Sequence, residues 1–345
     1  MAHPYPIREI ARQAGLSEAT VDRVLNARGG VRESTVREVR RAVEDLDRQR
    51  TQVRIGGRTF MIDIVMQCPD RFSSAVRDAL EAELPSLRPA ALRSRFHFRE
   101  TGPVGELVAT LDRIAARGSQ GVLLKAPDVP ETVAAVGRLA AAGIPVVTLA
   151  TDLPGSARLA YVGIDNRAAG ATAAYLVGQW LGDRTGDVLT TLSRGFFRNE
   201  EEREMGFRSA MRTAQPGRRL VEVTDSDGLD ATQRDLVREA LRAHPGIRAV
   251  YSVGGGNAAT AEVFAEAGRD CAVFVAHDLD HDNTRLLREG RVSAVLHHDL
   301  RQDMRDACLT VMRAHGALPD EGPPQPSPVQ VVTPYNVPST SAARR

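Results

Sequence analysis

The stretch IREIARQAGLSEATVDRVLN, residues 7–26, decides how the N-terminal region folds. Its first half places apolar side chains on one face of a short helix, which Gly15 interrupts, and Ser17 can cap a second helix. A third helical pattern follows Val31 and runs to about Asp47. The small core expected among the three helices consists of Ile10, Ala14, Leu16, Val21 and Val24. Two short helices joined by a tight turn, with a third behind them, predict a helix-turn-helix that enters the major groove of DNA, although a plain three-helix bundle has the same pattern.

This N-terminal region is basic, whereas the rest of the chain is slightly acidic. Residues 1–58 hold twelve arginines and eight acidic residues, a net charge of +4, against −3 for the remainder and +1 for all 345 residues. A small basic region favours an anionic partner such as nucleic acid. A solvated helical surface can carry the same excess, so the charge alone leaves both interpretations open.

The composition also narrows the class of protein. The cysteines, Cys68, Cys271 and Cys308, are far apart and form neither a metal pattern nor a disulfide framework. The first residues carry charges where a secretory signal needs an apolar run, and no apolar stretch is long enough to span a bilayer. No nucleophile elbow, P-loop or paired-histidine motif is present. We therefore expect a cytoplasmic protein that is not an enzyme and has no membrane contact, metal or cofactor.

The remainder of the chain predicts an α/β body. A polar, basic segment at residues 48–58 is interpreted as a linker or hinge between this body and a DNA-binding domain at residues 1–47. Strands and helices then alternate, and ten strands over roughly 240 residues fit two doubly wound parallel-sheet lobes better than one sheet. The predicted strands are Phe60–Met66, Ser94–Arg99, Gly121–Leu124, Ile144–Leu149, Leu159–Ile164, Val188–Leu192, Leu220–Thr224, Ala249–Val253, Ala272–His277 and Ala294–His297. The ligand-binding body is expected at residues 59–337, with lobe 1 at about 59–164 and 295–324, lobe 2 at about 165–294 and 325–337, and a disordered tail at 338–345.

The N-terminal motif resembles a known family. The segment Ile7–Ser17, followed by Ala19-Thr20-Val21 and Arg23-Val24-Leu25-Asn26, is similar to the head of the lactose-repressor (LacI-type) family. The resemblance extends over nearly the whole chain, and the body also resembles periplasmic sugar-binding proteins. It implies a transcription regulator, a repressor, that acts as a homodimer or a tetramer on a palindromic operator in double-stranded DNA. Its effector would be a small molecule such as a sugar or cyclitol.

The resemblance implies roles for residues at the start of the second helix. Glu18, Ala19 and Arg23 would face base edges, where an arginine prefers guanine, a glutamate can accept from cytosine and an alanine can touch a thymine methyl group. Phosphate contacts, with helix capping as the alternative, are expected from Ser17, Thr20 and Asn26.

The sequence departs from the family pattern in three places. Asp22 stands where a small hydroxyl residue is usual, so its carboxylate would repel phosphate or pair with Arg23. Arg32 stands where a capping serine is common. The linker contains no leucine to wedge into the minor groove, so that Ile55, followed by Gly56-Gly57, is the only candidate for that contact.

Parallel α/β lobes bind ligands where the carboxyl ends of their strands meet, so residues that follow the strands are the candidates for ligand contact. The resemblance places Phe72 against a sugar ring and Arg203, three residues before Gly206, in the cleft between the lobes. Ala150 and Gly255 occupy the family's usual contact positions, and the candidates Asp152 and Asn257 each come two residues later. The full set of candidates that the resemblance implies is Phe72, Asp152, Arg203, Asn257, Asp278 and His298.

Two other interpretations of the body stay open at this point. The run Gly254–Asn257 could cradle a phosphate, although it lacks the spacing of either nucleotide-binding fingerprint, and the acidic and histidine cluster at His277–Asp282 could bind a metal, although no second cluster supports it. A competing function is a cytoplasmic sugar-binding protein, or an enzyme acting on sugars, with an unrelated basic N-terminus.

Overall fold

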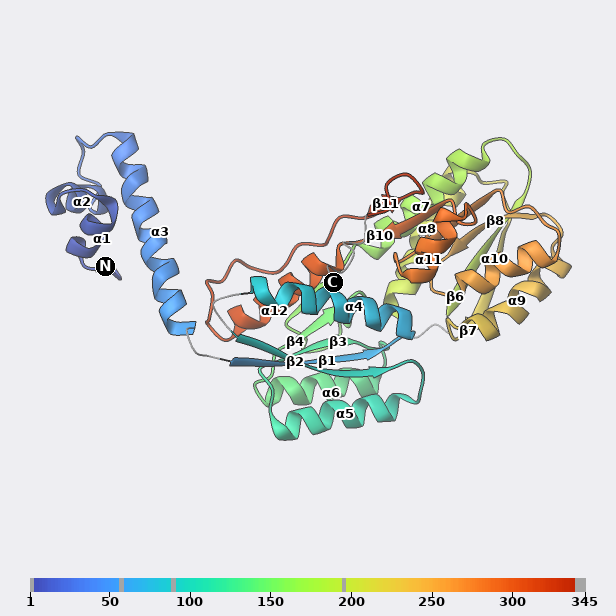
Figure 1. Ribbon diagram of the computed structural model, residues 1–345, viewed down its shortest axis with the longest axis horizontal. Coiled ribbons are helices and arrows are strands. Elements are labelled where there is room, and N and C mark those ends of the chain that lie inside the picture. The colour runs from blue at the N-terminus through green and yellow to red at the C-terminus, as the bar shows by residue number, and fades with distance from the viewer. Residues whose placement is uncertain (1–2, 56–58, 88–90, 194–196, 339–345) are drawn as a thin grey trace, which may run out of the picture.

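The computed structural model describes residues 3–55, 59–87, 91–193 and 197–338, without the side chains of residues 48–55 and 225. Three helices form the N-terminal head: α1 (Ile7–Ala14), α2 (Glu18–Leu25) and α3 (Glu33–Ile55). Gly15 ends α1 with a φ of +66°, a left-handed conformation that glycine adopts without strain, and so permits the tight turn into α2. The head stands apart from the rest of the molecule in Figure 1. Its buried core residues are Tyr5, Ile10, Ala11, Val21, Val39, Ala42 and Leu46.

The third helix is longer than the sequence analysis predicted. It continues past Asp47 to Ile55, through most of the segment interpreted as a linker. The reason is local, because residues 48–55 contain neither glycine nor proline, and the first helix-breaking pair is Gly56-Gly57. The side chain of Ile55 and all of residues 56–58 lie outside the described residues.

The first lobe is a five-stranded parallel sheet with helices on both faces. Its strands are β1 (Thr59–Gln67), β2 (Ala91–Arg99), β3 (Gly121–Lys125), β4 (Val146–Leu149) and β5 (Ala160–Val162), in the order β2-β1-β3-β4-β5. One face packs against α4 (Asp70–Glu83) and α12 (Leu300–Ala314), and the other against α5 (Val104–Arg117) and α6 (Pro130–Ala141), as Figure 1 shows. A short 3-10 helix, Leu84–Ser86, follows α4.

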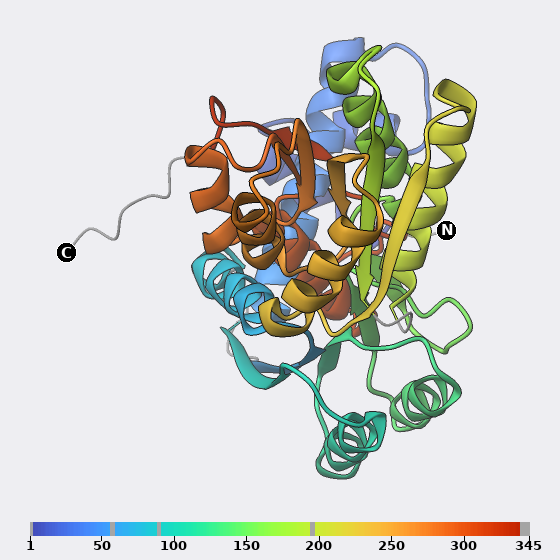
Figure 2. The same ribbon diagram turned by 90° about the vertical axis from the view of Figure 1, so that its right-hand side faces the viewer.

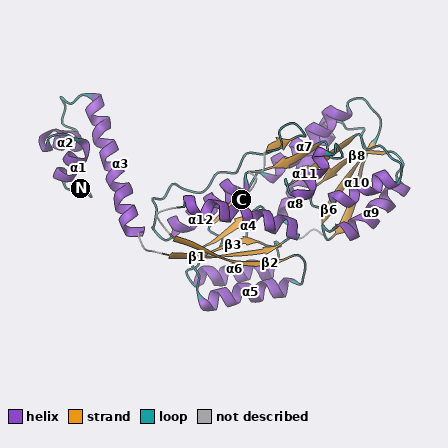
Figure 3. Cartoon of the chain, viewed as in Figure 1, coloured by secondary structure: helices purple, strands orange, loops and turns teal. Residues whose placement is uncertain are grey.

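The second lobe repeats this plan with six strands. They are β6 (Asp187–Ser193), β7 (Leu220–Ser226), β8 (Ile247–Ser252), β9 (Val273–His277), β10 (Ala294–His297) and β11 (Gln330–Val332), in the order β11-β10-β9-β8-β6-β7. All neighbouring strands are parallel except β10 and β11, which are antiparallel. One face packs against α7 (Asn166–Leu181) and α8 (Arg198–Ala214), and the other against α9 (Asp230–Ala243), α10 (Asn257–Glu266) and α11 (His281–Arg288). Figure 2 views the molecule from the side of this lobe, and Figure 3 shows its strands enclosed by helices.

The chain passes between the lobes after β5, after β10 and again after α12. Two of these crossings touch, since Ile164 and Ser327 form a parallel bridge and the amide of Ser327 donates to the carbonyl of Gly163 at 2.9 Å. Strand β10 pairs with β9 and β11, so the second crossing follows His297, three residues later than predicted. The architecture confirms the prediction of a small helical head and two doubly wound, predominantly parallel lobes. Residues 339–345, for which a disordered tail was predicted, lie outside the described residues.

Candidate functional site

The exposed face of α2 carries the residues predicted to read DNA bases. Glu18, Ala19 and Arg23 are all exposed, and the helical spacing of 18, 19 and 23 places them on one side of the helix. Val21 is buried against the head core on the other side. The helix therefore presents an anionic, an apolar and a cationic side chain to the solvent within two turns.

Ser17 caps α2, as predicted. Its Oγ accepts from the amide of Thr20 at 3.2 Å and lies 2.8 Å from the Thr20 hydroxyl. Asp22, the departure from the family pattern, pairs with Arg28 at 2.9 Å rather than with Arg23, and also accepts from the Asn26 side-chain amide at 2.7 Å. The carboxylate at position 22 is thus held toward the end of α2 by two neighbours.

A cavity of about 410 Å³, hereafter the cleft, opens between the two lobes. It is lined by residues that follow the carboxyl ends of strands from both sheets, as expected for doubly wound lobes. Three of the six residues predicted to bind a ligand line it: Phe72, Arg203 and Asp278. Phe72 stands in the first turn of α4, and Asp278 follows β9 with a φ of +66°, a strained conformation for a residue other than glycine.

Arg203 reaches the cleft because α8 lies unusually close to α7. A Cβ atom at Gly206 would lie 2.1 Å from the carbonyl oxygen of Arg167, and one at Gly170 would lie 1.9 Å from the carbonyl oxygen of Arg203. Glycine at both positions is therefore what permits this helix packing. The Arg203 side chain, 2% exposed, donates from Nε to Asn166 at 2.9 Å and from Nη1 to the Val253 carbonyl at 3.1 Å. Both partners are neutral, so the guanidinium is fixed in place without being neutralised.

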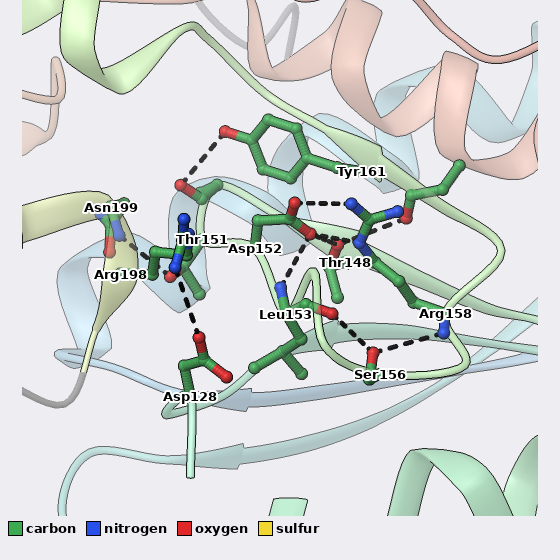
Figure 4. A network of polar contacts seen from close by, with 12 residues as sticks. Asp128, Thr148, Thr151, Asp152, Leu153, Ser156, Arg158, Tyr161, Arg198 and Asn199 are labelled. Atoms are coloured by element: carbon green, nitrogen blue, oxygen red, sulfur yellow. Dashed lines mark hydrogen bonds and ion pairs between the residues drawn. The ribbon is translucent and has the colours of Figure 1, made fainter. Parts of the chain in front are cut away.

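The other three predicted residues lie outside the lining of the cleft. The carboxylate of Asp152 binds Arg158 and accepts from the Thr148 hydroxyl and the Leu153 amide at 2.9 and 2.8 Å (Figure 4). Its polar neighbours within the first lobe occupy it, so its position does not support a ligand contact. Figure 4 also shows how close the second lobe comes, with the Asn199 amide donating to Thr151 Oγ1 at 3.3 Å.

Asn257 and His298 are buried behind the cleft. Asn257 begins α10, and its amide nitrogen donates to Asn283 at 2.9 Å. His298 Nδ1 contacts the Asp303 carboxylate at the start of α12, and its Nε2 lies 3.8 Å from Asp278 Oδ1. Their positions do not support direct ligand contact, but His298 stands where it can orient Asp278.

Sequence analysis missed Lys125, the last residue of β3. Its side chain is 8% exposed and lines the cleft, with Nζ 4.3 Å from the centre of the Phe197 ring and 5.8 Å from that of Phe72. Burial lowers the pKa of Lys125 below its usual value. The signal was present in the composition, because Lys125 is the only lysine in the sequence.

Arg71, also unassigned from the sequence, links the two lobes. Its Nε lies 3.1 Å from Asp280 Oδ2, and its Nη2 donates to the Gly228 carbonyl at 3.2 Å. Burial raises the pKa of Asp280 to about 6 despite this partner. Gly255 makes room for the arginine, since a Cβ there would lie 1.7 Å from Arg71 Nη2. The glycine run considered as a phosphate cradle therefore accommodates an arginine of the first lobe.

The structure does not support the metal site considered for His277–Asp282, because no group of three or more histidine, cysteine, aspartate or glutamate side chains suited to a metal ion occurs among the described residues. His277 instead lies within hydrogen-bond distance of the Tyr251 hydroxyl, 2.9 Å from Nε2, and burial holds its pKa well below the usual value. Among the described helices, none has the length and apolar character to cross a membrane.

Comparison with known families accounts for both parts of the chain. The family described as bacterial regulatory proteins, lacI family, matches residues 6–49, and the periplasmic binding protein domain matches residues 64–316. The chain is a lacI-family protein with a periplasmic binding protein domain. The head and the two-lobed body of this lacI-family chain thus coincide with the two matched regions. No curated protein matches the sequence.

Solved structures resemble the body of this lacI-family protein. A glucose-galactose binding protein from Geobacillus stearothermophilus has a TM-score of 0.72 at 21% identity, covering 81% of this chain and 99% of the other. A Bacteroides fragilis protein described as a LacI transcriptional regulator has a TM-score of 0.71 at 18% identity, covering 81% and 98%. An ABC transporter solute binding protein from Agrobacterium vitis, bound with alpha-D-tagatopyranose, has a TM-score of 0.72 at 20% identity, covering 83% and 98%. At such low identity the likeness establishes the fold alone.

Proposed function

We propose that this protein is a transcriptional repressor that binds a palindromic operator as a homodimer and senses a sugar, polyol or cyclitol in the cleft. The observation that carries the proposal is the combination, in one chain, of a lacI-family head whose helix α2 exposes Glu18, Ala19 and Arg23, and a cleft lined by residues of two lobes. Neither the family nor the fold is typically enzymatic, so we propose binding rather than catalysis as the role of the cleft.

In the head, we propose that Arg23 reads a guanine, with Glu18 and Ala19 contacting neighbouring bases. These three side chains are exposed on one face, which is the geometry that major-groove reading requires. Ser17, Thr20 and Asn26 would fix the register on the phosphates. Ile55 remains our candidate for a minor-groove contact.

In the cleft, we propose that Phe72 packs against the ring of the ligand while Arg203 and Asp278 bind its oxygen atoms. Phe72 and Asp278 belong to different lobes, so a ligand that contacts both favours the closed arrangement. The ion pair of Arg71 with Asp280 and the contact of Asn199 with Thr151 join the same two lobes. A change in lobe closure would alter the placement of the two heads of a dimer and hence operator affinity.

The DNA-binding part of the proposal is tested by selecting operators from a random double-stranded library with the full-length protein. We expect a palindrome to be enriched, and Arg23→Ala to lose discrimination at one base pair of each half-site by about 10-fold or more. Arg8→Ala, on the exposed side of α1, serves as a matched charge control and should keep the sequence preference. Absence of any enriched sequence, or turnover of sugars or sugar phosphates by the purified protein, would contradict the proposal.

A further inference from the structure

The only lysine of the chain lies in the cleft. The other 44 of the 45 basic residues are arginines, and Lys125 alone supplies a flexible ammonium group. A buried ammonium needs a partner, because leaving water without one is strongly unfavourable. Within the described residues, no hydrogen bond or ion pair reaches Lys125, whose contacts are the faces of two aromatic rings.

A second unneutralised cation faces the same cavity from the other lobe. Arg203 is 98% buried, since its exposed fraction is 2%, and its two hydrogen bonds go to the neutral oxygens of Asn166 and Val253. The positive charge of Arg203 adds to burial in lowering the pKa of Lys125, which means that the two cations repel each other. Cys68, Glu200 and Asp278 oppose this effect by raising the pKa of Lys125, but none of them forms an ion pair with it.

The carboxylates that line the cleft already have partners. Glu200 accepts from the amide and hydroxyl of Ser193 at 2.8 and 2.9 Å, and Asp280 pairs with Arg71 at 3.1 Å. The remaining contacts are those of Glu100 with the Asp70 amide, of Asp227 with the Leu229 amide and of Asp278 with His298. Most of these partners are neutral groups, as are those of Arg203, but Lys125 differs in having no hydrogen bond or ion pair at all among the described residues.

We propose that the effector is an acidic, monosaccharide-sized molecule whose carboxylate or phosphate group binds between Lys125 of the first lobe and Arg203 of the second. This inference rests on the proposed function, because it names the class of ligand that the same cleft senses. An oxyanion between the two cations replaces their repulsion with two charge-assisted hydrogen bonds. Since the cations belong to different lobes, the anion makes both contacts only when the cleft is closed, so the charge of the ligand drives closure.

The test uses the full-length protein and matched ligand panels. Thermal-shift screening followed by calorimetry compares neutral aldoses and inositols with their uronates, aldonates and monophosphates, which also separates carboxylate from phosphate. We expect binding by a member of an acidic panel, with its neutral counterpart about 10- to 100-fold weaker. Lys125→Met, which keeps the length of the side chain, should lower affinity for the acid by the same factor and so abolish the preference for the acid over its neutral counterpart, whereas Lys125→Arg should retain the preference.

The outcomes distinguish a failure of the acidic-effector proposal from a failure of the proposed sugar sensing. The acidic-effector proposal is overturned if the protein prefers the neutral counterpart, or if wild type and Lys125→Met bind the acid equally well. Neither result contradicts the proposed sugar sensing. Stabilisation by neither panel counts against sugar sensing itself. Because there is one lysine, [13C]lysine-labelled wild-type protein gives a single side-chain signal. An acidic ligand should raise the pKa that this signal reports, and an unchanged titration would overturn the proposal even if the Met variant failed to fold.

Discussion

The close packing of α7 on α8 makes a sharp prediction, because one added methyl group should displace the helix that carries Arg203. A Cβ at position 206 would lie 2.1 Å from the carbonyl oxygen of Arg167, so the helices must separate by about 1.3 Å to reach ordinary contact. Overpacking of this kind costs about 1–3 kcal/mol. Alanine recovers about 1 kcal/mol through its higher helix propensity. With a rigid backbone atom as the obstacle, we expect Gly206→Ala to destabilise the second lobe by about 2 kcal/mol.

Gly178→Ala is the matched control on α7. Its added Cβ would lie 3.3 Å from Nε2 of Gln215, a side-chain atom that donates to the Gly178 carbonyl at 3.1 Å and needs to shift by only a few tenths of an ångström to reach ordinary contact. The same substitution should therefore be neutral or stabilise the lobe by up to about 1 kcal/mol.

The single tryptophan makes the measurement specific to this lobe, because Trp180 lies near the end of α7. Urea unfolding followed by its fluorescence should give a lower midpoint for Gly206→Ala and an unchanged or higher one for Gly178→Ala. If both variants were at least as stable as the wild type, the close approach of α7 and α8, and with it the explanation for the position of Arg203, would be refuted.

Two further predictions concern Asp280 and Ser17. The pKa of Asp280 is raised from 3.8 to about 6 in the folded state, so the folded state holds the carboxyl proton more tightly than the unfolded chain does. This contribution to the free energy of unfolding is fully present below about pH 3.8 and is lost as pH rises through 6. From pH 4 to 7 the unfolding free energy of wild type should therefore fall relative to Asp280→Asn by up to about 3 kcal/mol, and parallel pH profiles in urea titrations would contradict this. Ser17→Ala removes the cap of α2 and should destabilise that helix by about 1 kcal/mol, seen as roughly five-fold faster hydrogen exchange at the Thr20 amide. Ser17→Asp, which can still cap, should exchange like the wild type.

Most of the fold was predictable because hydrophobic patterning and turn residues act locally. The glycine at position 15 and the cap at position 17 set the helix-turn-helix, and each of the ten predicted strands overlaps an observed strand. The end of α3 was placed too early because polar, arginine-rich sequence was interpreted as a linker, although such residues are good helix formers.

The cleft was less predictable because its contacts depend on which side chains the two lobes bring together. Asp152 follows a strand as a ligand-binding residue would, yet Arg158, only six residues further on, occupies its carboxylate. Conversely, Arg71 and Asp280 are more than two hundred residues apart, so no local sequence pattern predicts that they pair. Lys125 is the last residue of a fully buried strand, and the apolar residues that precede it do not predict a polar site at that position.

The central claim is that a ligand in the cleft controls DNA binding by the head. The most direct test is fluorescence anisotropy with the selected operator, comparing the Kd of the full-length protein with and without a saturating ligand from the screened panels. We expect the ligand to change the Kd by about 5- to 150-fold in the wild type. In Arg203→Met we expect no ligand response and an unchanged Kd for DNA alone. An operator Kd that is the same with and without bound ligand in the wild-type protein would contradict the account.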